Sequence, residues 1–199
     1  MYLRPVFTET ETGRIVALIE ANPFGVLVTD AGGMDASHIP FVVTRQGDGF
    51  VLTAHLARAN PQSARLAGGR ALAIFSGPHA YISPGWYATQ PSVPTWNYAA
   101  VHVHGDLEPV EDEAGAMEML RRMAAYDPEG FDVDAMEPKY RRAMLAGISA
   151  FRLVPDRVEA QWKMSQNRSV TDRSNVIAAL RGQGNEAVAA LIEATLPAR

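Results

Sequence analysis

Short strand-like runs, separated by turns and with almost no helix between them, constrain this fold most strongly. Parallel strands need long crossover connections, which are usually helices, so neighbouring runs without helices indicate antiparallel pairing. The sequence therefore predicts a closed, mostly antiparallel β-barrel with peripheral helices, an α+β architecture, rather than a doubly wound sheet. The expected strands span residues 24–29, 37–44, 50–54, 71–76, 79–83, 95–107, 147–154 and 158–161.

Helical patterns lie at both ends of the chain and in one insertion. Thr8 and Glu11 have the spacing of a capping box, which predicts an N-terminal helix that Pro23 ends. A short helix is expected over 61–67 with Asn60 as its N-cap, and glycines 32 and 33 form a turn after Asp30. We expect a barrel domain over 1–170, with a helical insertion near 111–146, and a C-terminal helical extension over 171–199 packed on the barrel.

The composition argues against several functions. Among 199 residues, 18 Lys and Arg stand against 22 Asp and Glu, a formal charge of −4, so no basic excess marks a general nucleic-acid binder. Without cysteine the chain has no disulfide, no thiolate metal site and no cysteine nucleophile. The N-terminal residues lack the pattern of a secretory signal, and no apolar run is long enough to span a bilayer. We therefore expect a cytoplasmic protein.

The first polar segment, residues 53–62, lies where a strand is expected to lead into a short helix. Backbone N–H groups and the helix dipole favour an anion at such a junction, and an arginine fork matches phosphate geometry. The alternative is a polar loop with an ordinary N-cap. The candidate residues are Thr53, His55, Arg58, Asn60 and Gln62.

The second polar segment, residues 161–168, follows the last expected strand. Its cations and its hydroxyl and amide groups suit the phosphate and polyol parts of a ligand, and Trp162 offers apolar surface for a ring. The alternative is a solvated loop that ends the barrel. The polar candidates are Lys163, Ser165, Gln166, Asn167 and Arg168.

Aromatic residues are concentrated between the two segments, in 75–87 and 93–98. Such rings form a ligand-facing wall, a partner interface or a corner of the core, and the sequence leaves these alternatives open. His102 and His104 follow, and strand alternation places them on one face. A further His or Glu is not nearby in the sequence, so we expect a surface or interface pair and no metal site.

The C-terminal helix pair does not resemble a DNA-reading module. Positive and negative side chains balance there, and apolar residues at helical spacing indicate packing on the barrel instead. The charged residues concerned are Arg173, Arg181 and Arg199 against Asp172, Glu186 and Glu193. Direct DNA binding is therefore doubtful. A nucleophile elbow, a P-loop, a dinucleotide fingerprint and a His-Glu-x-x-His motif are all absent from the sequence.

Six stretches, in order, resemble the PaiB-like family of FMN-binding negative transcriptional regulators. The match covers the chain from its start to about residue 170. Each stretch alone is weak evidence, whereas the ordered set is specific. The matching stretches are MYLRPVF from residue 1, HIPF from 38, HLARANPQ from 55, FSGPHAYISP from 75, VPTWNYAAVH from 93 and KMSQNR from 163.

This resemblance implies an FMN-binding split barrel and a homodimer with two flavin sites at the subunit interface. Thr53, His55, Arg58 and Asn60 would then line the phosphate end of the flavin. The segment around 162–168 would complete the grip, with a contribution from the other subunit. Residues 38–41, which include His38, would lie along the ring, and Trp96 and Asn97 would approach it from the interface. The two polar segments are thus expected to converge on one phosphate.

Three functions are compatible with these patterns. The first is a flavin-binding regulator that acts through a partner or through the flavin rather than by reading DNA. The second is an FMN-dependent oxidoreductase that uses a nicotinamide and a small substrate. The third is a barrel that binds haem or a metal through histidines. The sequence identifies no catalytic residue, so it leaves open whether the protein is an enzyme.

Overall fold

The computed structural model describes residues 1–30 and 33–197. The expected turn after Asp30 includes Ala31 and Gly32, and the expected C-terminal extension includes Ala198 and Arg199. Those four residues lie outside the described part of the chain.

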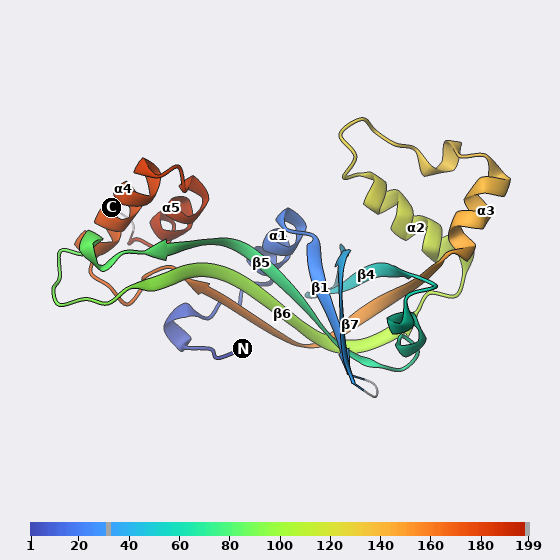
Figure 1. The fold of residues 1–199 in the computed structure, drawn as a ribbon, viewed down its shortest axis with the longest axis horizontal. Helices are drawn as coiled ribbons and strands as arrows, with labels where there is room; N and C mark the ends of the chain where they lie inside the picture. Colours follow the sequence, from blue (N-terminus) through green and yellow to red (C-terminus); the bar gives the residue numbers. More distant parts are fainter. Residues whose placement is uncertain (31–32, 198–199) are drawn as a thin grey trace. The chain divides into compact units, whose positions relative to one another are not determined.

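Seven strands form one sheet in the order β2-β1-β5-β6-β7-β4-β3 (Figure 1). β1 pairs with β2 and β5, β3 pairs with β4, and β4 pairs with β7, each time in antiparallel register. The predicted antiparallel α+β architecture is therefore confirmed. The strands are β1 (Phe24–Asp30), β2 (Met34–Pro40), β3 (Val42–Gln46), β4 (Gly49–Ala57), β5 (Arg70–Ile82), β6 (Thr95–Pro109) and β7 (Ile148–Lys163).

Five α-helices and four short 3₁₀ turns accompany the strands in the described part of the chain. None of these described helices combines the length and apolar character needed to cross a membrane. The α-helices are α1 (Thr12–Ala21), α2 (Glu113–Ala124), α3 (Pro138–Ala146), α4 (Val170–Gly182) and α5 (Glu186–Glu193). The 3₁₀ turns are η1 (Pro5–Phe7), η2 (Pro61–Arg65), η3 (Pro84–Trp86) and η4 (Val133–Ala135).

The predicted capping box of Thr8 and Glu11 was wrong. Helix α1 begins at Thr12, whereas Thr8 forms an antiparallel bridge with Gln161 and its hydroxyl donates to the Arg4 carbonyl. Glu9, rather than Thr8, accepts bonds from the backbone N–H groups ahead of the helix. A strand partner from far along the chain has therefore displaced a locally plausible cap. The Asn60 cap is confirmed, because its side chain accepts from the Gln62 N–H at 2.9 Å.

Three strand boundaries also differ from expectation. The run 37–44 divides at Phe41, whose N–H donates to the Pro23 carbonyl instead of joining a ladder. The runs 71–76 and 79–83 form one strand, β5, and the last two runs form β7. Pro78 and Pro155 interrupt these patterns in the sequence. Pro78 lies past the part of β5 that pairs with β1, and Pro155 lies past the part of β7 that pairs with β4. The missing proline N–H therefore costs no hydrogen bond to β1 or β4.

The described chain divides into two compact units. Unit 1 comprises Met1–Glu11, Ser76–Val101 and Glu159–Arg199, and unit 2 comprises Thr12–Phe75 and His102–Val158. Strands β5, β6 and β7 contribute residues to both. The expected division at residue 170 stays a prediction, although α4 does begin there.

Fully buried aromatic and aliphatic side chains form the core of unit 2. Phe41 packs edge-on against Phe75, with ring centroids 5.2 Å apart. Leu27, Leu52 and Phe151 are also completely buried, and they come from β1, β4 and β7. The inward faces of antiparallel strands thus supply this core, as the alternating burial along β4 shows.

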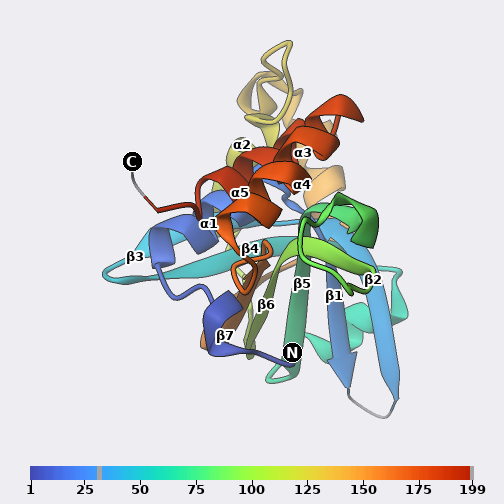
Figure 2. The ribbon, with the colours of Figure 1, turned by 90° about the vertical axis from the view of Figure 1, so that its left-hand side faces the viewer.

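In unit 1, α4 and α5 lie side by side (Figure 2). Their apolar faces are buried through Val176 and Leu180 of α4 and through Val188 and Ile192 of α5. Ser169 caps α4 by accepting from the Asp172 N–H at 3.1 Å. The helices anticipated from residue 171 are therefore present, with their apolar faces covered.

Gly105 of β6 marks a close approach between backbones within unit 2. A Cβ atom at this position would lie 2.0 Å from the Val154 carbonyl oxygen and 3.0 Å from the Pro155 Cα. Because the obstructing atoms belong to backbone, a larger residue cannot be accommodated by rotating a side chain.

We therefore expect Gly105→Ala to lower the free energy of unfolding by about 1–3 kcal/mol or more, as overpacked cores do. Urea unfolding followed by circular dichroism measures this loss. Gly49→Ala is the matched control, because the nearest atom to its Cβ would be 3.7 Å away. Equal stability of the two variants would contradict the assigned close approach.

Candidate functional site

The first polar segment starts on β4 of unit 2. Thr53 lies opposite Val42 of β3 and Arg152 of β7, and His55 lies opposite Ala150. Burial lowers the pKa of His55, and its Nδ1 atom is buried without a hydrogen-bond partner. The lowered pKa favours the neutral imidazole of His55, and its Nδ1 is left without a partner beside the end of a strand.

Arg58 joins this segment to the junction between α3 and β7. Its Nε donates to the Ala146 carbonyl at 2.7 Å, and its Nη2 donates to the Ile148 carbonyl at 2.8 Å. Its backbone N–H donates to the Gly147 carbonyl at 2.8 Å. These bonds satisfy carbonyls at the end of α3 and fix the guanidinium plane.

Asn60 and Gln62 have structural roles. Besides capping η2, Asn60 donates from Nδ2 to the Ser37 hydroxyl at 3.0 Å. Gln62 is buried, and its Nε2 donates to the Thr29 hydroxyl at 3.0 Å and to the Leu27 carbonyl at 3.2 Å. The start of η2 is therefore tied to β1 and β2.

A cavity of about 620 Å³ opens beside this junction in unit 2. Arg58 and Arg142 contribute cations to its wall, and Ser63 and Ser149 contribute hydroxyls. The start of α2 places acidic side chains on the wall as well, namely Glu111, Asp112 and Glu113. The cavity thus has a cationic part, which suits an anion, and an acidic part, which does not.

His38 is exposed on β2 and stacks on Phe24 of β1, with ring centroids 6.2 Å apart and planes 30° apart. These two rings lie in unit 2, on the same strand pair that supports Asn60 through Ser37.

The second polar segment lies in unit 1, where Ser165 meets Asn97. The Asn97 Nδ2 donates to the Ser165 hydroxyl at 2.9 Å, and that hydroxyl lies 3.2 Å from the Asn97 Oδ1. Both residues are buried. Ser165 has φ of 61°, which a non-glycine residue adopts only under constraint. The structure therefore brings together two predicted site residues that are far apart in the sequence.

Lys163 and Gln166 are also engaged within unit 1. The Lys163 Nζ donates to the Thr95 hydroxyl and, at 2.9 Å, to the Trp96 carbonyl. Burial, with a smaller effect of the Arg4 charge, lowers the pKa of Lys163. Gln166 accepts from the Met164 N–H at 2.7 Å and donates to the carbonyl of buried Trp162 at 2.6 Å.

Arg168 lies on an aromatic ring. Its Cζ is 4.3 Å from the centroid of the Tyr87 ring, a cation–π geometry, and its Nη1 donates to the Ser92 hydroxyl at 3.3 Å. The aromatic stretch between the two segments supplies this ring. It also supplies exposed Trp96, whose ring centroid lies 6.0 Å from that of Tyr81 and 6.3 Å from that of His79.

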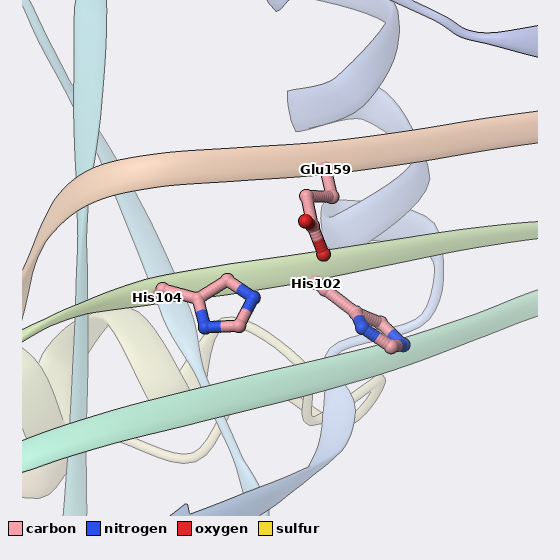
Figure 3. Close-up of side chains that lie close together, drawn as sticks. All are labelled: His102, His104 and Glu159. Atoms are coloured by element: carbon pink, nitrogen blue, oxygen red, sulfur yellow. The ribbon is translucent and has the colours of Figure 1, made fainter. Parts of the chain in front are cut away.

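His102 and His104 lie on the same side of β6, as strand alternation predicted, with ring centroids 6.5 Å apart. The Arg157 Nη2 lies 3.1 Å from the His104 Nδ1. Figure 3 draws these imidazoles together with Glu159, a residue of β7 that belongs to the other unit. Within unit 1, Glu159 accepts from the Met1 amino group. We assign no metal to the three side chains.

The predicted site residues therefore form two groups. The unit 2 group comprises His38, Thr53, His55, Arg58, Asn60 and Gln62, and the unit 1 group comprises Asn97 and the candidates between Trp162 and Arg168. Convergence of the two polar segments on one phosphate stays a prediction. Sequence reasoning missed Arg142 and Ser149 of the unit 2 cavity, because they come from the insertion and from β7 and carry no local motif.

The burial of His55 predicts a pH-dependent stability. Its folded pKa lies below the unfolded value of about 6.5, so the unfolded chain binds the proton more readily. Its contribution to the free energy of unfolding is full above the unfolded pKa and falls as pH drops towards the folded pKa.

Urea titrations above and below about pH 6.5 test this, with His55→Gln as the comparison. We expect stability to fall less steeply with acidification in His55→Gln than in the unaltered chain. The other histidines remain in both proteins and cancel in this difference. Parallel pH profiles for the two proteins would show that His55 titrates alike in the folded and unfolded chains.

Comparison with known proteins gives the context of these groups. The family described as "Putative FMN-binding domain" matches residues 1–157. "Protease synthase and sporulation protein PAI 2" of Bacillus subtilis is 35% identical over 190 residues, which cover 93% of this chain and 91% of that protein. The family match and the Bacillus relative confirm the predicted PaiB-like family. The family is described by its FMN binding, so the predicted cofactor, FMN, is confirmed as well.

Two solved structures share the fold. The FAD and haem binding protein of Mycobacterium smegmatis has a TM-score of 0.61 at 20% identity, over 86% of this chain and 79% of that one. A flavocytochrome of Azotobacter vinelandii has a TM-score of 0.59 at 15% identity, over 81% and 72%. The chain therefore has the predicted split-barrel fold and belongs to the PaiB-like family of FMN-binding domains.

Proposed function

We propose that this protein uses bound FMN in regulation, through a partner or through the state of the flavin, and does not read DNA directly. The observation that carries the flavin assignment is the cavity at the end of β4, where Arg58 and Arg142 supply cations. The Bacillus relative's name assigns that protein to protease synthesis and sporulation, which supports a regulatory role here.

The residues present fit a flavin phosphate. The cavity volume of about 620 Å³ lies within the usual range for small-molecule sites. The bonds of Arg58 to two carbonyls use Nε and Nη2 and hold the guanidinium in place for an anion. The acidic start of α2 would repel a phosphate, so the phosphate would lie on the side of Arg58 and Ser63. His55, close by in sequence, adds a half-buried imidazole whose buried Nδ1 has no hydrogen-bond partner.

Residues of the second segment are proposed to hold flavin as well. Asn97 positions the hydroxyl of Ser165, and the Tyr87 ring positions Arg168. Lys163, Gln166 and Trp162 complete this group. Bound FMN would supply electron or hydride transfer, whereas the side chains of this chain bind and orient it.

We also propose a homodimer, in agreement with the family resemblance. Trp96 and Tyr81 pack edge-on and remain 53% and 48% exposed, and Val93 is 69% exposed. Aromatic rings on a surface are enriched at protein interfaces. A cytoplasmic location stays a prediction.

The two arginines of α4, Arg173 and Arg181, support the proposal that the protein does not read DNA directly. Arg181 is held by Glu186 at 3.0 Å and by Glu193 at 2.8 Å. Arg173 is buried and donates to the Thr195 hydroxyl. Neither arginine is thus presented to a phosphate backbone, which supplies most of the affinity for nucleic acid.

Replacing Arg58 tests the flavin site. We expect Arg58→Gln to weaken FMN binding by about tenfold or more, since a charge-assisted bond contributes about 1.5–3 kcal/mol. Flavin fluorescence during FMN titration measures the affinity. Arg45→Gln, an exposed charge loss on β3, is the control. Unchanged FMN affinity in Arg58→Gln, with the fold intact by circular dichroism, would remove Arg58 from the site.

A gel-shift titration tests the regulatory part of the proposal. The flavin-loaded protein is expected to give no sequence-selective shift of DNA upstream of its own gene at physiological salt. Tight, selective and salt-sensitive binding would refute indirect action. Rapid bleaching of bound flavin by NADH or NADPH, with turnover of an acceptor, would instead favour the oxidoreductase alternative.

A further inference from the structure

A second cavity, of about 340 Å³, lies entirely within unit 1, and no residue of the first polar segment lines it. The N-terminal residues form one wall, and side chains of β6 and β7 form the other. None of the lining residues is acidic. They are Met1, Tyr2, Arg4, Phe7, Tyr98, Gln161 and Lys163.

The N-terminal wall is held in place by hydrogen bonds to β7. Thr8 bridges Gln161, and the Glu9 N–H donates to the Ala160 carbonyl at 2.9 Å. The η1 turn then returns the chain so that Arg4 lies over Phe7, with its Cζ 5.3 Å from the ring centroid. These contacts place Arg4 at the cavity instead of leaving it on a free end.

Two cations share this cavity. The charge of Arg4 contributes to the lowered pKa of Lys163, after the larger effect of burial, so the two positive groups act on each other. The Met1 amino group is a third cation, but Glu159 neutralises it at 2.5 Å. An anion between Arg4 and Lys163 would relieve their repulsion and pair with both.

Tyr98 and Gln161 add polar groups. The Gln161 Nε2 donates to the Tyr98 hydroxyl, which leaves the hydroxyl's own hydrogen to be donated elsewhere. Gln161 is only 4% exposed, and its Oε1 is buried without a hydrogen-bond partner. An unsatisfied buried acceptor is unfavourable and needs a donor. An oxyanion has none to give, so a water molecule between this oxygen and the anion would supply the missing hydrogen bond.

We propose that this cavity binds a small aromatic oxyanion, a single ring that carries a carboxylate or a phosphate. Arg4 and Lys163 pair with the oxyanion, the Tyr98 hydroxyl donates to it, and the rings of Tyr2 and Phe7 provide apolar surface. The volume lies near the lower end of the range for ligand sites, which suits one ring. This site goes beyond the proposed flavin function and shares only Lys163 with the residues proposed to hold flavin.

Isothermal titration calorimetry with the full chain tests the proposal. Benzoate and phenyl phosphate are the two anionic probes, and benzamide is the neutral match for benzoate. We expect at least one anion to bind at least tenfold more tightly than benzamide, and the better of the two identifies the headgroup. Equal affinity for benzoate, phenyl phosphate and benzamide, or no binding of either anion, would overturn the proposal.

Two variants locate the binding. Arg4→Gln should weaken the better anion about tenfold or more, and Tyr98→Phe should weaken it by a smaller factor. Arg45→Gln is the control for the loss of a charge, and melting temperatures establish that each variant is folded. Undiminished binding in both folded variants would place the anion elsewhere and refute the site.

The same samples separate this inference from the flavin proposal. FMN affinity is measured in parallel by flavin fluorescence, and it should be unchanged in Arg4→Gln and Tyr98→Phe. Loss of FMN binding in these variants, together with loss of the anion, would show that the cavity is part of a flavin site and would refute a separate one.

Discussion

The structure depends on three strands, β5, β6 and β7, that are long enough to contribute to both compact units. These strands extend past the residues where β5 pairs with β1 and β7 pairs with β4. Beyond those residues, their N–H groups have no partner in β1 or β4. Pro78 and Pro155 lie beyond the registers with β1 and β4, where an N–H is not needed for those ladders. Gly105 allows β6 to approach the Val154 carbonyl where a side chain would not fit. Residues that interrupt a strand pattern in the sequence are therefore what permits these strands to be continuous.

The ends of these strands carry the polar groups of unit 1. Asn97 follows the start of β6, and Ser165 follows the end of β7, so their mutual hydrogen bonds join two chain segments. A serine at φ of 61° is unfavourable by itself, and such a conformation persists only where the surroundings determine it. The hydrogen bonds between the buried amide of Asn97 and the Ser165 hydroxyl stabilise this conformation. Neighbouring Lys163 is likewise held by tertiary contacts, to Thr95 and Trp96, whereas Gln166 is held by local bonds to Met164 and Trp162.

Local signals predicted what local interactions determine. The Asn60 cap, the antiparallel pairing and the alternation of His102 and His104 all follow from contacts within a few residues or from strand geometry. The capping box at Thr8 failed because Gln161, far along the chain, takes Thr8 into a bridge. Arg142 escaped notice for the same reason, since only the folded insertion brings it to the cavity that Arg58 lines. The six family stretches are far apart in the sequence, and only their ordered set identified the flavin-binding class. Such a set carries information on residues that meet only in the folded chain, which no single local pattern contains.

Lys163 shows how tertiary structure divides a motif that the sequence presents as one group. The sequence of residues 162–168 groups it with Arg168 as a second phosphate cation. In the folded chain its ammonium donates to Thr95 and Trp96 and lies on the cavity that Arg4 lines. Arg168 instead lies over the Tyr87 ring. Two cations of one short segment thus face different surroundings, and an anion at one would not by itself satisfy the other.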